Sequence, residues 1–393
     1  MGNKKIKILF IHHGTGIGGA SICLKELILS LNDSVDPMVL CLKNSDAVSF
    51  FENSGIKTNV LDSFFYRKIY TFWPHIEGTT FSITSIISLP RYVISYILNV
   101  LFFSKKTLKD YNFDILYLNT TFLTDWAFIG KRCYAKVIMH VREPLGKGFL
   151  GLRRFFFRKV INQNVQHIIA ISNDNAGRIG LPLKTTVIYD PMRKAIFSKQ
   201  INITENNKYF LYLGGLQMIK GFYVLVKALP YLNKNVKIFI AGSLDNNFRS
   251  GIVGKIKKQY EKYWKKKLRN SDAIIELGLI DNVYDYLNAS NFLLFPSVIP
   301  HFAGPIMEAY KIGKPVIASD VSGMDEIVNS KTGLFFSNKN AKNLAKTIND
   351  CANLSDFEYL KFEKDCLNMY NTIYDSNLKV DYVIQKVLSN NKI

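Results

Sequence analysis

Short, continuously apolar runs alternate along the chain with longer stretches whose apolar residues recur at helical spacing. In the first half the runs cover 6–12, 37–42, 114–118, 136–141, 167–171 and 185–189, and in the second half 209–213, 236–241, 273–277, 292–295, 315–318 and 333–336. A strand that is apolar at every position is buried on both faces, as in a parallel sheet covered by helices. The pattern predicts an α/β fold of doubly wound parallel sheets.

The alternation stops once, at a polar segment over 190–208 that contains Pro191, and then restarts. Because 393 residues exceed the usual size of one core, we interpret this segment as a linker between two Rossmann-like domains, 1–190 and 191–375. A C-terminal helix over 376–393 follows, and packing back on the first domain is one arrangement open to it. Two such domains would face each other across a cleft where the carboxyl ends of both sheets meet.

The segment 83–103 is the most apolar long stretch, and Pro90, Arg91, Ser95 and Asn99 interrupt it. We therefore expect an amphipathic helix, either buried or lying on a membrane, rather than a helix that spans one. The apolar run at 6–11 is too short for a secretory signal. These features predict a cytoplasmic protein, peripheral on the cytoplasmic face of the membrane.

The formal net charge is +20, which favours a partner that carries phosphate: a nucleotide, a nucleic acid or an anionic membrane. Residues 153–159 mix basic and aromatic side chains, which fits either a membrane interface or core packing. The lysine-rich stretch 255–269 fits a solvated helix face, and no nucleic-acid-binding module is recognisable. The five cysteines are scattered, so we expect reduced thiols and neither a disulfide framework nor a metal site.

Two glycine-containing turns each follow a strand and precede a helix. The first, GTGIGGAS at 14–21, contains Gly18 and Gly19, and such a turn either receives a phosphate at the helix N-terminus or is only a tight turn. The second, LGGLQMIKG at 213–221, contains Gly214, Gly215 and Lys220. Lys220 either neutralises a diphosphate or is a solvated helix lysine.

Three further polar groups follow predicted strands. Glu308 falls in the first turn of a helix after the strand at 292–295. A carboxylate there complements the helix dipole or accepts the ribose hydroxyls of a nucleotide. His140 ends the strand at 136–141 and is either a site residue or a satisfied core histidine. Arg142 and Glu143 come next, and they contact an acceptor or pair with neighbouring groups.

The chain resembles the retaining GT-B glycosyltransferases of family 4 over nearly its whole length. The similarity is strongest at GGAS (18–21), GGLQMIKG (214–221), PSVIPHFAGPIMEA (296–309) and GKPVIASDVSGMDEIV (313–328). It implies a retaining transfer from a nucleotide-sugar donor, linked to UDP or GDP, with no metal and no other cofactor.

The resemblance also implies roles for particular residues. Catalytic roles fall on His140, Lys220 and Glu308. The donor would bind at Gly18 and Gly19 from the first domain, at Gly214, Gly215, Lys220 and Glu308, at Leu279 and Ile280 beside the base, and at His301, Phe302, Ala303, Gly304, Pro305 and Ile306 around the sugar. Arg142 and Glu143 would contact the acceptor.

Two positions depart from the family pattern. Gly215 stands where the family has an arginine, and Pro300 stands where it has the first glutamate of an acidic pair. Arg193 and Lys194 are candidates to replace the missing cation. Because the lost glutamate contacts the sugar, the donor sugar is not predicted.

The basic–aromatic and apolar stretches favour a glycan or lipid-linked glycan acceptor at an anionic membrane surface. The expected process is the assembly of a cell-surface polysaccharide or lipopolysaccharide such as O-antigen. Two alternatives remain open: a GT-B nucleotide-sugar epimerase, which needs no acceptor, and a non-catalytic scaffold subunit that kept the fold.

Overall fold

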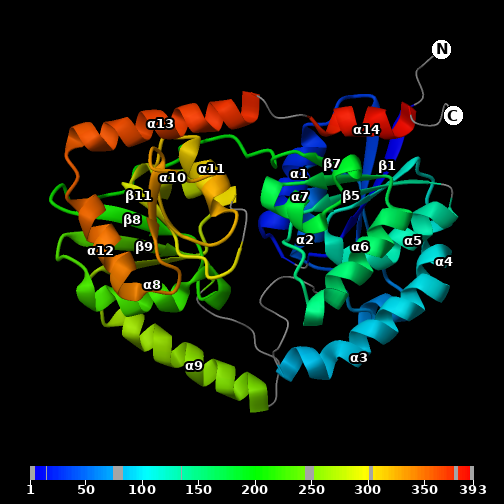
Figure 1. Ribbon diagram of the computed structural model, residues 1–393, viewed down its shortest axis with the longest axis horizontal. Helices are drawn as coiled ribbons and strands as arrows, with labels where there is room; N and C mark the ends of the chain where they lie inside the picture. The colour runs from blue at the N-terminus through cyan, green and yellow to red at the C-terminus, as the bar shows by residue number, and fades with distance from the viewer. Residues whose placement is uncertain are drawn as a thin grey trace. The chain divides into compact units, whose positions relative to one another are not determined.

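The chain folds into two units, each built around its own parallel sheet, as the computed structural model shows (Figure 1). Unit 1 comprises Met1–Met192 with Asn377–Ile393, and unit 2 comprises Arg193–Ser376. The structure describes residues 5–14, 16–73, 83–133, 135–243, 252–300, 304–375 and 379–389.

The sheet of unit 1 has seven strands in the order β3-β2-β1-β4-β5-β6-β7, and every neighbouring pair is parallel. Its strands are β1 Ile6–His12, β2 Val35–Cys41, β3 Thr58–Val60, β4 Ile115–Leu118, β5 Lys136–Val141, β6 His167–Ala170 and β7 Thr185–Val187. The order reverses between β1 and β4, so the loops that leave these two strands diverge at their carboxyl ends.

Successive residues of these strands point to opposite faces, and each face is buried under helices. Ile8 and Phe10 of β1 join one core with α1 (Gly19–Leu29), α2 (Asp46–Glu52) and α14 (Val380–Ser389). Leu9 and Ile11 join a second core on the other face. Its helices include α4 (Ser104–Leu108), α5 (Thr124–Arg132), α6 (Leu152–Asn164) and α7 (Asn173–Ile179).

The C-terminal helix α14 lies within unit 1, although all of unit 2 separates it in sequence from the strands that it covers (Figure 1). Val383 and Ile384 are fully buried in the core that contains Ile8 and Phe10. Asn32 donates its backbone N–H to Asp381 at 3.3 Å. Two distant parts of the chain therefore build one core.

The sheet of unit 2 has six parallel strands in the order β10-β9-β8-β11-β12-β13. These are β8 Lys208–Tyr212, β9 Val236–Ala241, β10 Ile274–Gly278, β11 Phe292–Phe295, β12 Val316–Ser319 and β13 Gly333–Phe336. Helices α8 (Phe222–Ala228), α9 (Ile252–Arg269) and α12 (Ala341–Ala352) share one core with the sheet. Helices α10 (Val283–Asn288), α11 (Gly304–Tyr310) and α13 (Asp356–Asp375) lie on the opposite face of the sheet from α8 and α9 (Figure 1).

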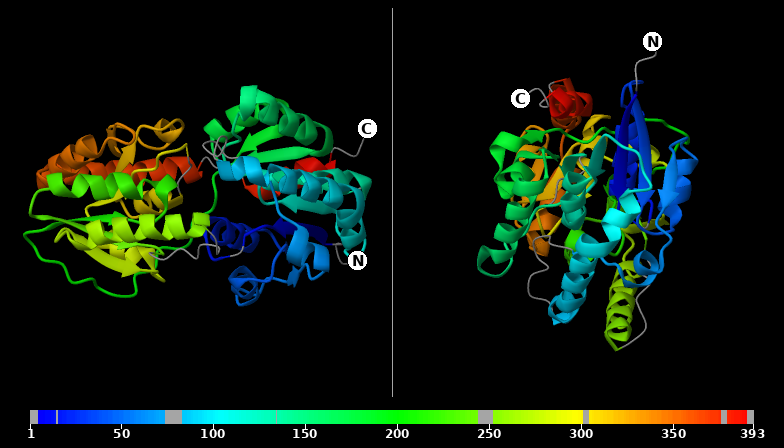
Figure 2. Two further views of the ribbon diagram at one scale, coloured as in Figure 1. Left: turned by 90° about the horizontal axis from the view of Figure 1, so that it is seen from below. Right: turned by 90° about the vertical axis from the view of Figure 1, so that its right-hand side faces the viewer.

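These elements confirm the predicted α/β class with two doubly wound sheets. The pattern missed β3, a three-residue strand that is only partly buried at the sheet edge and therefore leaves no apolar run. The segment 83–103 forms α3 (Ile83–Leu98) and the π-helical turn η2 (Asn99–Phe103), which continue into α4 as one rod (Figures 1 and 2). Among the described residues, no helix is both long and apolar enough to cross a bilayer.

Ser95 and Asn99, which interrupt the apolar pattern of that segment, face the interior of unit 1. Ser95 Oγ donates to the carbonyl of Thr71 at 3.0 Å, and Asn99 Nδ2 donates to Asp125 Oδ2 at 2.7 Å. Both side chains are buried. The segment therefore places these two polar residues inward and leaves several apolar ones exposed.

Candidate active site

In unit 2 the strand order reverses between β8 and β11. The two loops that lead to the candidate donor-binding residues leave the sheet at this point. The loop after β8 carries Gly214, Gly215 and Lys220, and the loop after β11 leads into α11 with Glu308. The tertiary structure thus brings together two motifs that lie about ninety residues apart.

Hydrogen bonds hold the two loops against each other. The backbone N–H of Val298 donates to the carbonyl of Ile219 at 3.0 Å, and Ser297 Oγ donates to the carbonyls of Ile219 at 3.3 Å and Ile299 at 2.9 Å. Gly221 has φ +78°, and a Cβ there would lie 1.7 Å from the carbonyl oxygen of Pro296. Only glycine fits at this crossing, so the loop pair is defined by backbone contact.

The backbone around Gly215 explains why glycine stands at a position where the family that the sequence resembles has an arginine. Its φ is +51°, and a Cβ would lie 2.5 Å from the carbonyl oxygen of Ser243. Its N–H donates to the carbonyl of Ala241 at 3.0 Å. This turn packs too tightly against the end of β9 for any side chain at position 215.

Lys220 ends the short helix η6 (Met218–Lys220) and is half-buried. Burial lowers the pKa of its ammonium group. It lines a small pocket with Tyr212, Gly214, Phe295 and Pro305. A cation that is partly desolvated in this way gains more from an anionic ligand than a solvated one.

Glu308 is buried on α11, and Arg193 from the linker lies against it. Arg193 Nε donates to Glu308 Oε1 at 2.7 Å. Burial raises the pKa of the Glu308 carboxyl, while the charges of Arg193 and Lys311 oppose that rise. Arg193, a candidate for the missing cation, is thus placed beside the candidate ribose ligand.

The remaining predicted donor residues differ in how the structure shows them. Gly304, Pro305 and Ile306 form the first turn of α11, and a Cβ at Gly304 would meet no atom within 4 Å. Leu279 is 82% exposed directly after β10, and Ile280 is half-buried. His301, Phe302 and Ala303 lie outside the described residues.

In unit 1 the glycine turn after β1 leads directly into α1. Gly18 is the N-cap of this helix and Gly19 its first residue, and a Cβ at either would meet no atom within 4 Å. Ser21 Oγ donates to the carbonyl of Gly16 at 2.8 Å and lies 3.1 Å from His12 Nε2. The N-terminus of α1 is therefore open, and the turn before it is tied to the end of β1.

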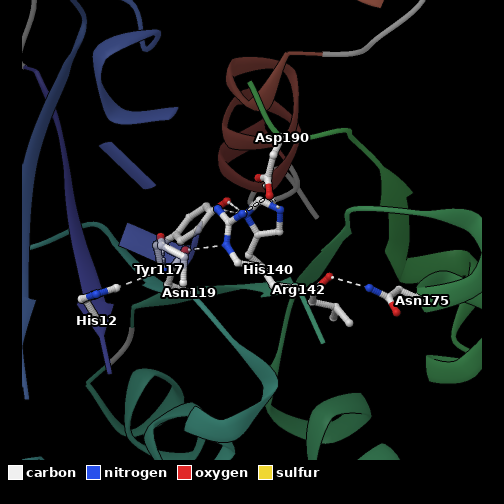
Figure 3. A network of polar contacts seen from close by, with 9 residues as sticks. His12, Tyr117, Asn119, His140, Arg142, Asn175 and Asp190 are labelled. Atoms are coloured by element: carbon white, nitrogen blue, oxygen red, sulfur yellow. Dashed lines mark hydrogen bonds and ion pairs between the residues drawn. The ribbon is translucent and has the colours of Figure 1, made fainter. Parts of the chain in front are cut away.

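A buried polar network continues from His12 across the carboxyl ends of β1, β4 and β5 (Figure 3). Asn119 Nδ2 lies 3.3 Å from His12 Nδ1, and its Oδ1 accepts from Arg142 Nε at 3.0 Å. Arg142 Nη1 forms an ion pair with Asp190, and both side chains are buried. The network therefore links the glycine turn to Asp190, near the end of the first segment of unit 1 (Met1–Met192).

His140 lies at the centre of this network and is neutral. Its Nδ1 is 2.8 Å from Tyr117 Oη and 3.3 Å from Arg142 Nη2, and the guanidinium can only donate. Nδ1 is therefore the acceptor, and the ring proton resides on Nε2, 3.7 Å from Asp190 Oδ1. Burial, with the charge of Arg142 as a smaller cause, holds the pKa of His140 well below its ordinary value.

Arg142 and Glu143, predicted to contact an acceptor or to pair with neighbours, both have partners within unit 1. Arg142 binds Asn119 and Asp190, as above, and Glu143 Oε2 accepts from Thr120 Oγ1 at 2.6 Å. Burial raises the pKa of the Glu143 carboxyl to about 7, and the Thr120 hydrogen bond and the Arg142 charge oppose this rise.

The sequence reading missed His12, Asn119 and Asp190 as members of the network. His12 ends the apolar run at 6–12, Asn119 follows the run at 114–118, and Asp190 follows the run at 185–189. This position at a carboxyl strand end is the signal that could have identified them.

Comparison with protein families gives one match within unit 2. Residues 193–364 match the model of the family described as glycosyl transferases group 1. These residues contain the second glycine turn, Lys220 and Glu308.

Two curated relatives indicate the same class of protein. An uncharacterised glycosyltransferase of Methanocaldococcus jannaschii is 25% identical over 66% of this chain and 71% of its own. The N,N'-diacetylbacillosaminyl-diphospho-undecaprenol alpha-1,3-N-acetylgalactosaminyltransferase of Campylobacter jejuni is 27% identical over 43% of this chain and 42% of its own. The chain thus spans less than half the length of the second relative.

The solved structures include HepE of Anabaena in complex with UDP-glucose. It aligns with a TM-score of 0.70 and 19% identity, over 98% of this chain and 99% of that chain. At this identity the match shows the fold alone. The chain has the GT-B fold, and the family and relative matches together support a GT-B glycosyltransferase.

Proposed function

We propose that this protein is a retaining glycosyltransferase whose unit 2 binds a nucleotide-sugar donor. The observation that carries this proposal is the placement of Lys220 on the loop after β8 and of Glu308 on α11, the helix that follows the loop after β11, at the switch point of the sheet of unit 2. An ammonium group suits a diphosphate, and a buried carboxylate suits ribose hydroxyls. The UDP-glucose bound by HepE supports a UDP-linked donor, with a GDP-linked donor as the second choice.

In the proposed reaction, the bond between the sugar C1 and the donor phosphate oxygen breaks, and a bond from C1 to an acceptor hydroxyl oxygen forms on the same face. Lys220 and the first turn of α11 stabilise the departing diphosphate, which leaves as a nucleoside diphosphate and takes the acceptor proton. No step requires a metal ion. In unit 1 we propose that Gly18 and Gly19, at the open N-terminus of α1, bind phosphate oxygens and that His140 offers its Nε2 proton to the sugar.

The acceptor in this proposal is a lipid-linked glycan, used in cell-surface polysaccharide or lipopolysaccharide assembly on the cytoplasmic face of a membrane. The name of the Campylobacter relative, which acts on a diphospho-undecaprenol, supports this substrate class. Glu143 and Arg142 remain our candidates for contact with the acceptor. Arg142 would act by positioning the loop, through its contacts with Asn119 and Asp190.

A surface of unit 1 made by α3, η2 and α6 supports this choice. We call it the α3–α6 surface. Ile94, Ile97, Leu101 and Phe102 are exposed along α3 and η2, and Phe155 is 68% exposed on α6. The ring centroids of Tyr96 and Phe156 are 6.3 Å apart, so the two helices are neighbours. Several exposed apolar residues on adjacent helices are typical of an interaction surface.

The charge of the same segments favours an anionic lipid surface as the partner. Residues 83–109 and 144–173 contain no aspartate or glutamate. They carry basic residues instead: Arg91, Lys105, Lys106 and Lys109 in the first segment, and Lys147, Arg153, Arg154, Arg158 and Lys159 in the second. Apolar side chains combined with basic ones bind the headgroup region of anionic bilayers.

A transfer assay tests the proposed reaction. A thermal-shift panel of nucleotide sugars first identifies the donor, because a bound ligand raises the melting temperature according to its concentration over its Kd. We expect nucleoside diphosphate release to require an acceptor, to persist in EDTA, and to be lost in Lys220→Ala and Glu308→Ala. Release or sugar inversion without acceptor would favour the epimerase, and the absence of any donor binding would favour the scaffold.

A vesicle assay tests the α3–α6 surface separately. We expect wild-type protein to sediment with phosphatidylglycerol vesicles at low salt and much less with phosphatidylcholine vesicles. Phe155→Ser with Phe156→Ser should weaken this binding, whereas Phe357→Ser, at an exposed phenylalanine of α13 in unit 2, should not. Equal sedimentation of all variants, or none for wild type, would contradict membrane docking.

A further inference from the structure

Arg193 is the first residue of unit 2 and is fixed to it by its backbone. Its carbonyl oxygen accepts from Tyr284 Oη at 3.0 Å and from Lys311 Nζ at 2.8 Å. Its guanidinium lies over the Tyr284 ring, 5.8 Å from the centroid. Because Tyr284 is fully buried on α10, these contacts hold a linker residue in one place.

The ion pair between Arg193 and Glu308 leaves both partners with unused hydrogen-bonding capacity. Only Arg193 Nε donates to Glu308, and among the described residues no hydrogen bond leaves its two Nη groups. Within the same part of the chain, Glu308 Oε2 accepts none. The Arg193 side chain is 30% exposed and that of Glu308 is 12% exposed, so the pair is open to a ligand on one side.

The geometry of this pair leaves the second carboxylate oxygen available to a ligand. Burying a carboxylate is costly unless its oxygens are satisfied, and a buried pair contributes little net stability compared with apolar packing. Here one oxygen is held by a fixed donor and the other is left without a protein partner. This arrangement resembles a preorganised acceptor for ligand hydroxyls.

We propose that Arg193 is a positioning residue that orients the Glu308 carboxylate so that its Oε2 binds the ribose hydroxyls of the donor nucleotide. The inference rests on the proposed function, in which Glu308 is the ribose ligand. Arg193 thus does not replace the arginine absent at Gly215 on the diphosphate. It makes the carboxylate selective for a ribose that carries both hydroxyls.

The charges around Glu308 support this role. The groups that face it are Arg193 from the linker and Lys311, which directly follows α11, and both lower a pKa that burial raises. Without Arg193 the pKa of Glu308 rises further. The carboxylate must be ionised to accept hydrogen bonds from the ribose hydroxyls. As the pH is lowered, it would then become protonated at a higher pH than in wild type.

Calorimetric binding of UDP, GDP and their 2'-deoxy counterparts tests the proposal. We expect wild type to prefer the ribonucleotide by about tenfold or more, as a hydrogen bond to a charged group implies. Arg193→Met should lose most of this preference, and Arg193→Lys should keep part of it. Arg269→Met removes an equally ion-paired arginine of unit 2, paired with Glu276 at 3.1 Å, and should leave the preference unchanged.

Two further measurements exclude a general structural defect. The affinity of Arg193→Met for the ribonucleotide should fall, as pH is lowered, at a higher pH than that of wild type. In a Glu308→Gln background, Arg193→Met should cause no further loss of the ribose preference, because the two residues act as one unit.

The outcomes separate this inference from the proposed function. If neither UDP nor GDP binds wild type, the donor site itself is wrong, and the role of Arg193 fails with it. If wild type binds and prefers the ribonucleotide, but Arg193→Met keeps that preference and the wild-type pH profile, Arg193 is a structural residue only and the donor site stands.

Discussion

Among single residues, the buried ion pair of unit 1 is the place where one substitution should cost the most stability. Arg142 and Asp190 are both buried, and each removes the penalty of desolvating the other. Arg142 also orders Asn119 and His140, so the pair fixes the carboxyl ends of β4 and β5. Neutralising one partner leaves the other as an unpaired buried charge.

We expect Asp190→Asn to lower the free energy of unfolding by about 3–5 kcal/mol, the usual cost of breaking a buried pair. Asp62→Asn is the matched control, since Asp62 and Arg67 form an exposed pair at 3.4 Å worth at most about 1 kcal/mol. Urea denaturation measures the free energy of unfolding of both variants. Equal losses would show that the buried Asp190 pair stabilises the protein no more than the exposed Asp62 pair.

Asp125 is a buried carboxyl group of the same unit, and it contacts η2 through Asn99. Tyr70 Oη and Asn99 Nδ2 donate to its Oδ2 at 2.9 and 2.7 Å. Burial raises the pKa of Asp125 from 3.8 to about 7, despite these two hydrogen bonds. In the unfolded chain this carboxyl loses its proton near pH 4, whereas in the folded protein it keeps the proton up to about pH 7.

At Asp125 the folded state therefore binds more protons between these two values, so the contribution of this carboxyl to stability falls as pH rises from about 4 to 7. Asp125→Asn cannot titrate and should remove this part of the slope. We expect wild type and variant to be similar at pH 4 and the variant to be more stable at pH 8 by a few kcal/mol, on the order set by the pKa shift. Parallel pH–stability curves from thermal melts would contradict a raised pKa at Asp125.

At the scale of elements, the turn between β8 and α8 shows how backbone packing limits the chemistry. The left-handed φ of Gly215 and its contact with Ser243 exclude a side chain, although the family pattern has an arginine there. Placing the arginine of that family at position 215 should therefore destabilise the protein.

We expect Gly215→Arg to lower the free energy of unfolding by about 1–3 kcal/mol, the cost of backbone strain, and not to improve nucleotide binding. Gly177→Ala is the control, because Gly177 lies within α7 with no atom within 4 Å of a Cβ and no left-handed φ. Alanine there should be neutral or slightly stabilising. Tighter donor binding by Gly215→Arg, measured by calorimetry, would refute the steric explanation.

At the scale of the whole molecule, the chain crosses between its units twice, and its last helix completes the first core. Ile384 on α14 is fully buried beside strands that lie more than three hundred residues earlier. Unit 1 is thus complete only after unit 2 has been synthesised, so its stability depends on the C-terminus.

Ile384→Ala should destabilise unit 1 by about 2–5 kcal/mol through the cavity that it leaves, while the preference for a ribonucleotide, assigned to Arg193 and Glu308 of unit 2, stays unchanged at 25 °C. Tyr382→Ala, at an exposed position of the same helix, is the control. Calorimetric melting combined with titration of ribo- and 2'-deoxynucleotides separates the two effects, and a loss of the ribose preference in Ile384→Ala would contradict a ribose site contained in unit 2.

The sequence by itself determined the fold class, because buried parallel strands require apolar runs whose spacing can be counted. It also located both glycine turns, Lys220 and Glu308, since each lies in a local motif at the end of a strand. It missed β3 because an exposed edge strand of three residues needs no apolar run.

Only the tertiary structure decided which residues meet. His12, Asn119, His140, Arg142 and Asp190 form one network because parallel strands end at a common edge of the sheet, and no local pattern records such pairings. The same holds for Arg193 and Glu308, which are 115 residues apart, and for α14 in the core of unit 1. Local periodicity fixes the elements, whereas long-range packing and the pairing of buried charges fix the site.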